Sequence, residues 1–88
     1  MNGSPIRLLI AEDDINLRKV LRIELSAAGF RVAEARNGQD ALGRLQKEEF
    51  DVLLLDLNMP GLPGMELRQK IREQELPIEV VILTADVT

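Results

Sequence analysis

The pattern of hydrophobic and polar residues divides this chain into two kinds of segment. Short apolar runs predict β-strands at residues 7–11, 30–35, 50–56 and 78–83. Between them, apolar residues spaced three and four apart predict amphipathic helices at residues 15–28, 39–47 and 65–75. In the first helix the apolar stripe consists of Leu17, Val20, Leu21, Leu25 and Ala28. In the other two, the predicted inward positions are Ala41, Leu42, Leu45, Leu67 and Ile71.

Capping and turn residues lie where these helices are expected to begin and end. Asp13 or Asp14 can cap the first helix, and Gly29 can end it in the left-handed conformation. Asn37, before Gly38, is a possible cap of the second helix. Prolines and glycines between residues 59 and 64 predict a loop, and Pro77 prevents the third helix from continuing.

The predicted order is therefore βαβαβαβ. Strands that alternate with helices favour right-handed crossovers and a parallel sheet with helices on both faces. The run 7–11 is apolar enough to be buried on both faces, and 78–83 is expected to be a further buried strand, whereas 30–35 is more polar and suits a sheet edge. Residues 1–5 are expected to form a loose tail, and residues 6–88 one domain.

Acidic residues follow two of the predicted strands. Glu12, Asp13 and Asp14 come after the run 7–11, and Asp56 ends the run 50–56. The carboxyl ends of parallel strands meet at one edge of the sheet, where ligands bind in such folds. Carboxylates gathered there repel one another unless a cation intervenes. A hard divalent cation such as Mg²⁺ prefers oxygen ligands, so the pattern predicts an acidic metal pocket that contains Asp56.

The amino-acid composition excludes several classes of function and of binding site. A net charge of −4 and only two aromatic residues, Phe30 and Phe50, argue against a nucleic-acid surface. No apolar run approaches the roughly 20 residues that span a bilayer, and no signal peptide is visible, which favours a cytoplasmic protein without membrane contact. Cysteine and histidine are absent. The expected chemistry is therefore that of carboxylates, hydroxyls and metal ions.

Several motifs together resemble the receiver domain of two-component response regulators. They are the acidic cluster 12–14, Asp56, the loop Met59-Pro60-Gly61-Leu62-Pro63-Gly64, and Thr84-Ala85 after the fourth strand. The resemblance extends from about residue 6 to residue 88, and it implies a flavodoxin-like, CheY-like sheet with strand order 2-1-3-4. It also implies a sensor histidine kinase as phosphodonor and an output domain or protein as recipient of the signal.

The resemblance also implies roles for single residues. Asp56 would be the phosphoacceptor, and Thr84 the hydroxyl that turns toward the phosphoryl group. Asp13 and Asp14 would bind Mg²⁺ together with Asp56, and Asn58 would contribute its backbone carbonyl. Glu12 is expected to lie beside the metal site rather than in it. Such a domain would promote its own phosphorylation without turning over an external substrate.

The chain departs from the family pattern after the fourth strand. A fourth helix, a fifth strand with its following lysine, and a fifth helix would be missing, so the sequence resembles a truncated receiver. The lysines present are Lys19, Lys47 and Lys70, all on predicted helices. An exposed fourth strand would favour a homodimer through residues 78–83.

Other interpretations of the same residues remain. The acidic cluster 12–14 could be only a helix cap with dipole-complementing acids. The chain could serve as a non-phosphorylated structural or dimerisation fragment. A haloacid-dehalogenase-like phosphatase also uses an aspartate nucleophile with Mg²⁺. That class is expected to carry a second aspartate two residues after the nucleophile, where this chain has Asn58.

Overall fold

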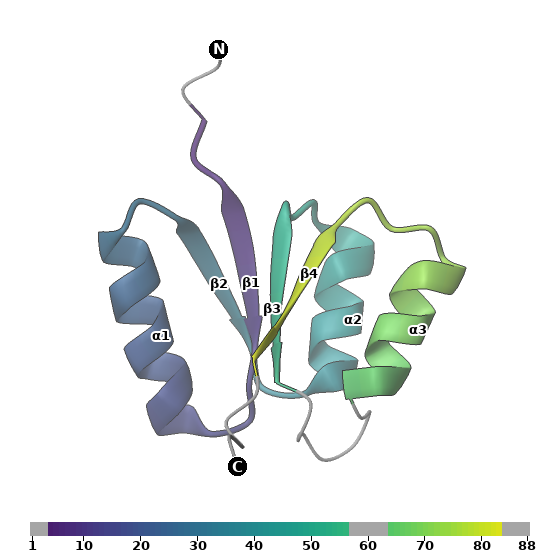
Figure 1. Ribbon diagram of the computed structural model, residues 1–88, viewed down its shortest axis with the longest axis horizontal. Coiled ribbons are helices and arrows are strands. Elements are labelled where there is room, and N and C mark those ends of the chain that lie inside the picture. Colours follow the sequence, from purple (N-terminus) through teal and green to yellow (C-terminus); the bar gives the residue numbers. More distant parts are fainter. Residues whose placement is uncertain (1–3, 57–63, 84–88) are drawn as a thin grey trace.

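A four-stranded parallel sheet forms the centre of the molecule. The computed structural model describes residues 4–56 and 64–83. Its elements are β1 (Arg7–Ala11), α1 (Ile15–Ala27), β2 (Arg31–Ala35), α2 (Gly38–Lys47), β3 (Val52–Asp56), α3 (Gly64–Glu73) and β4 (Glu79–Leu83). The strand order is β2-β1-β3-β4, all parallel, which confirms the predicted topology. Helix α1 covers one face of the sheet, and α2 and α3 cover the other (Figure 1).

The main core lies between the sheet and the α2–α3 layer. Leu9, Leu53, Leu55 and Leu67 are fully buried there, because alternate residues of a strand face the same side. The predicted inward residues of α2 and α3 pack in this layer: Ala41, Leu42, Leu45, Leu67 and Ile71. Strand β1 is buried along almost its whole length, as expected for an inner strand with helices on both faces.

Local signals placed the ends of α1 and α2 to within one residue. Asn37 caps α2 and accepts a hydrogen bond from the Asp40 amide at 2.8 Å. After α1, Gly29 has φ of +104°, and the Phe30 amide donates to the Leu25 carbonyl. This is the left-handed termination that a glycine after a helix predicts.

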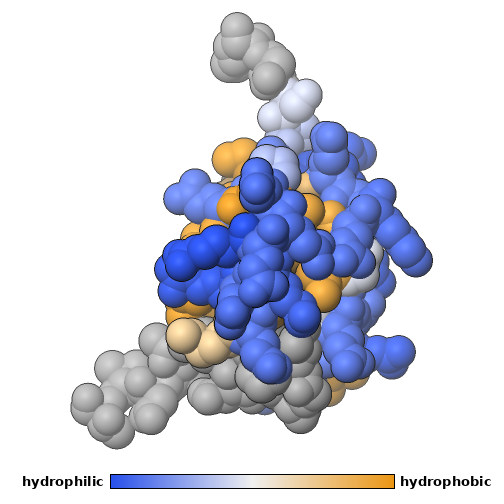
Figure 2. All heavy atoms as spheres, turned by 90° about the vertical axis from the view of Figure 1, so that its right-hand side faces the viewer, coloured by the Kyte–Doolittle hydropathy of each residue, from blue (hydrophilic) through white to orange (hydrophobic). Residues whose placement is uncertain are grey.

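Helix α3 ends two residues earlier than predicted. It stops at Glu73 rather than Glu75, because Glu75 itself adopts a left-handed φ of 53°. The Leu76 amide then donates to the Ile71 carbonyl, which closes the helix before Pro77 is reached. The outward side chains of α3 are largely hydrophilic, as Figure 2 shows from that side of the molecule.

Three burial predictions were wrong. On α1, Val20 is 50% exposed and Ala28 is exposed too, so neither belongs to an inner stripe, whereas Leu17, Leu21 and Leu25 are half-buried. Strand β4 is not buried, and Val81 on it is 45% exposed. In the described part of the chain, β4 is one of the two edge strands of the sheet, with β2 at the opposite side, so only one edge of β4 is paired.

Candidate functional site

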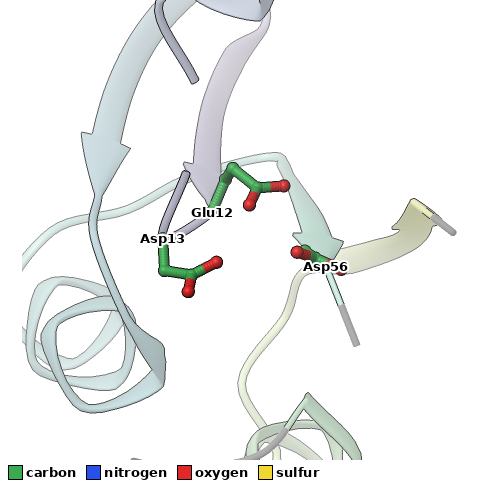
Figure 3. A group of neighbouring side chains, drawn as sticks. All are labelled: Glu12, Asp13 and Asp56. Carbon is green, nitrogen blue, oxygen red and sulfur yellow. The ribbon is translucent and has the colours of Figure 1, made fainter. Parts of the chain in front are cut away.

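Two neighbouring strands end in carboxylates that share one small space. Glu12 and Asp13 directly follow β1, and Asp56 is the last residue of β3. Because Ala11 pairs with Leu55, the next positions along the two strands are Glu12 and Asp56. One carboxylate oxygen from each of Glu12, Asp13 and Asp56 lies within 4.8 Å of the other two. In Figure 3 the three side chains reach into the space between the ends of β1 and β3.

Glu12 is the most deeply buried member of this cluster. Its exposure is 2%, against 8% for Asp56, whereas Asp13 lies at the surface. The pKa of Glu12 is raised from 4.5 to about 7, chiefly by burial and also by the neighbouring carboxylates of Asp56 and Asp13. The opposing influence is the Asp14 amide, which donates to Glu12 Oε2 at 3.0 Å. The site therefore disfavours a third negative charge.

One carboxylate oxygen of the cluster lacks a donor. Glu12 Oε1 is buried and finds no hydrogen-bond partner within residues 4–56 and 64–83. A buried carboxylate oxygen in this position needs either a proton or a cation. The cluster consists entirely of hard oxygen donors, which are the ligands of Mg²⁺ and Ca²⁺. These residues therefore suit a divalent cation.

Asp14 lies outside the cluster. Its side chain caps α1, where Oδ1 accepts hydrogen bonds from the amides of Asn16 at 2.9 Å and Leu17 at 3.2 Å. The helix begins immediately after Asp14, so this carboxylate turns toward the first helical turn. The acidic set brought together is thus Glu12, Asp13 and Asp56, where the sequence pointed to Asp13, Asp14 and Asp56. A metal role for Asp14 stays a prediction.

The alternation of strand side chains could have identified Glu12. Leu8 and Ile10 lie on the face that α1 covers, and Glu12 continues the same alternation just beyond the strand. The spacing of Asp14 before Ile15 already indicated a cap. What the sequence lacked was the register of β1 against β3, in which Ala11 pairs with Leu55 and Glu12 therefore lies beside Asp56.

Two other predicted site residues, Asn58 and Thr84, lie outside the described residues. The three lysines lie on α1, α2 and α3, as predicted. Within the part of the chain that the structure describes, no lysine follows the end of a strand.

Comparison with known protein families gives a match over almost the whole chain. The model of the response regulator receiver domain matches residues 8–88. The chain belongs to the response regulator receiver domain family. This membership agrees with the resemblance seen in the sequence and favours it over the phosphatase class.

Curated relatives carry a receiver of this kind in proteins of different length. The response regulator receiver protein CpdR of Brucella abortus is 38% identical over 89% of this chain and 65% of its own length. The transcriptional regulatory protein TrcR of Mycobacterium tuberculosis is 34% identical over 96% of this chain, which spans 33% of TrcR. The sensor protein EvgS of Escherichia coli is 37% identical over 92% of this chain, which spans 7% of EvgS.

Solved receiver structures have the same fold. The chemotaxis protein CheY4 of Vibrio cholerae superposes with a TM-score of 0.89 at 31% identity, covering 97% of this chain and 72% of CheY4. The response regulator TrrA of Thermotoga maritima, solved in complex with Mg²⁺-BeF, superposes with a TM-score of 0.87 at 33% identity. That match covers 92% of this chain and 70% of TrrA. No described helix of the receiver is long and apolar enough to cross a membrane.

Proposed function

We propose that this receiver accepts a phosphoryl group on Asp56 from a sensor histidine kinase, with Mg²⁺ bound at the acidic cluster. The observation that carries the proposal is the meeting of Glu12, Asp13 and Asp56 within 4.8 Å at the ends of β1 and β3. Receiver domains are signalling modules of two-component systems, which makes phosphoryl transfer the chemistry to test here.

Mg²⁺ would be held by the carboxylates of Glu12, Asp13 and Asp56. Mg²⁺ characteristically uses a few carboxylates and keeps several waters, and the exposure of Asp13 leaves one side of the cluster open to solvent. The buried Glu12 Oε1 is a ready oxygen ligand. A relative solved with Mg²⁺-BeF, TrrA, supports this choice of ion. When bound, the ion neutralises charge that builds up on the transferred phosphoryl group.

Asp56 supplies the nucleophile in this proposal. A carboxylate oxygen of Asp56 forms a bond to phosphorus while the bond from phosphorus to the kinase imidazole nitrogen breaks, and the imidazole leaves with that electron pair. The product is an aspartyl phosphate. Strand β3 orients Asp56, because Asp56 pairs with Leu83 of β4 and the preceding Leu55 pairs with Ala11 of β1. Asn58, through its backbone carbonyl, and Thr84, as the switch hydroxyl, stay predictions for the same reaction.

The output of the signal is expected to lie in an attached domain or a separate protein. The relatives include a transcriptional regulatory protein and a sensor protein, so one receiver type accompanies several outputs. A cytoplasmic location likewise stays a prediction, as does the division into a tail at residues 1–5 and a domain at residues 6–88.

The phosphoacceptor is tested by intact-mass spectrometry after incubation with a small phosphodonor, with and without Mg²⁺. We expect a Mg²⁺-dependent gain of one phosphoryl group that Asp56→Asn abolishes without unfolding the chain. Asp51→Asn is the matched control, because Asp51 precedes the same strand at its opposite end. Equal labelling of Asp56→Asn, or no labelling of the folded wild type, would contradict the proposal.

A second function, self-association, is favoured by the outer strand. The described structure pairs β4 on one edge only, and Val81 is 45% exposed. Exposed apolar edge strands recruit other strands, so we propose a homodimer through β4. Sedimentation velocity should show a dimer that Val81→Lys disrupts. A single monomeric species at high concentration would exclude this association.

A further inference from the structure

The main chain of Glu12 is held from two sides. Its amide donates to the Ala35 carbonyl at the end of β2, at 3.1 Å. Its carbonyl accepts a hydrogen bond from Arg18 Nη1 at 2.8 Å. Arg18 lies on the second turn of α1, and its side chain is only 14% exposed. Both contacts act on a residue that lies just beyond β1 and therefore lacks the full pairing of a strand.

Arg18 is in turn held by an acidic residue of β2. Its Nε donates to Glu34 Oε1 at 3.0 Å. A guanidinium carries its donors in one rigid plane, so the bond to Glu34 fixes the direction in which Nη1 points. Glu34 lies directly before Ala35, which accepts from Glu12. Arg18, Glu34 and Glu12 thus connect α1, β2 and the end of β1.

We propose that Arg18 and Glu34 position the acidic cluster for its cation. Holding the Glu12 carbonyl fixes the backbone of that residue, and the backbone decides where the carboxylate lies relative to Asp13 and Asp56. Arg18 is a positioning residue, since it bonds to the backbone of Glu12 rather than to a carboxylate of the cluster. This inference rests on the proposed Mg²⁺ site. It predicts that the affinity for Mg²⁺ depends on a side chain outside the cluster, as is usual for residues that hydrogen-bond to metal ligands.

Arg22 offers a matched control on the same helix. Its Nε pairs with the other oxygen of Glu34, Oε2, also at 3.0 Å. Among the hydrogen bonds of the described residues, Arg22 makes none to Glu12. Removing Arg22 therefore takes one positive charge and one ion pair from the same carboxylate, while the bond to the Glu12 carbonyl remains.

The test is Mg²⁺ titration by calorimetry on the full chain, comparing Arg18→Gln, Arg18→Lys, Glu34→Gln and Arg22→Gln. Arg18→Gln should raise the Kd for Mg²⁺ about tenfold. Arg18→Lys should not restore it, because one ammonium group cannot reproduce the planar fork that joins Glu34 to the Glu12 carbonyl. Glu34→Gln should weaken binding in the same direction, and Arg22→Gln should stay within about twofold of wild type, since the cluster keeps its support.

Urea unfolding of each variant separates positioning from general stability. If Arg18 only stabilises the fold, Mg²⁺ affinity will follow the free energy of unfolding across all variants, Arg22→Gln included. Wild-type affinity in Arg18→Gln, or equal weakening in Arg22→Gln, would overturn the inference. If Arg18→Gln does not fold, the Mg²⁺ affinities of Arg18→Lys and Glu34→Gln are compared with that of Arg22→Gln instead.

Amide hydrogen exchange tests the same contact without any metal. Exchange at the Glu12 amide should accelerate in Arg18→Gln and not in Arg22→Gln. If the wild type binds no Mg²⁺, the proposed metal site fails, and the exchange result still decides whether Arg18 holds Glu12. Unchanged exchange in Arg18→Gln would refute the positioning role.

Discussion

Replacing Glu12 with glutamine should stabilise the metal-free receiver at neutral and alkaline pH. Glutamine resembles the protonated acid: its oxygen can still accept from the Asp14 amide, and its NH₂ group can donate to Asp56. The substitution therefore keeps the shape and the hydrogen bonds of Glu12 while it removes a buried negative charge beside two other carboxylates.

The magnitude follows from the raised pKa of Glu12. The folded chain holds this proton more tightly than the unfolded chain, because the pKa rises from 4.5 to about 7. The stabilising contribution of the protonated acid is therefore complete below pH 4.5 and is lost as the pH rises through about 7. At about 1.4 kcal/mol for each pKa unit, the loss amounts to about 3–4 kcal/mol. The glutamine variant does not titrate and should keep that stability at pH 8.

The assay is urea unfolding followed by far-UV circular dichroism, from pH 4.5 to pH 8.5, in the presence of a chelator. Wild type should lose stability across this range by about 3 kcal/mol more than Glu12→Gln does. Glu24→Gln, on the exposed side of α1, is the matched control and should follow the wild type. Added Mg²⁺ should then stabilise the wild type at pH 8 and have little effect on Glu12→Gln, because a cation offsets the buried charge.

Parallel stability curves of wild type and Glu12→Gln over the whole pH range would refute this reasoning. A glutamine variant that is less stable at pH 8 would do the same. Either result would mean that Glu12 ionises in the metal-free protein at no cost, and that burial beside Asp56 does not disfavour its charge.

Three further predictions concern the helix ends and the core. Asp14→Ala should lower the free energy of unfolding by about 1 kcal/mol through loss of the α1 cap. Asp14→Ser, which keeps a capping oxygen, should leave both stability and Mg²⁺ affinity near wild type; a large loss of affinity in calorimetry would show that Asp14 is a ligand after all. Glu75→Gly should stabilise the chain by about 1 kcal/mol, because glycine adopts the left-handed φ of 53° without strain, and Glu75→Ala should not. Leu53→Ala should cost about 2–5 kcal/mol in urea unfolding, since Leu53 is fully buried; a smaller loss would mean that the sheet relaxes around the cavity.

Much of this architecture was determined by the sequence alone, because hydrophobic periodicity and helix-capping residues are local signals. Apolar periodicity placed every helix and strand, and the side chain of Asn37 and the glycine at position 29 marked helix ends that the structure confirms. The alternation of strands and helices was sufficient to predict a parallel sheet, and the resemblance to receiver domains supplied the order β2-β1-β3-β4 that the structure confirms. The acids at the strand ends likewise indicated at which edge of the sheet the carboxylates gather.

Only the tertiary structure decided which acids meet. Glu12, Asp13 and Asp14 are consecutive and chemically alike, and the local signals of strand alternation and helix capping do not show which of them meet Asp56. The register of β1 against β3 sets Glu12 beside Asp56, and Asp14 caps the start of α1. The exposure of Val20 and Ala28 was equally out of reach, because burial depends on which elements pack against a face. Contacts between residues distant in sequence, such as Arg18 with Glu34, arise only when the chain has folded.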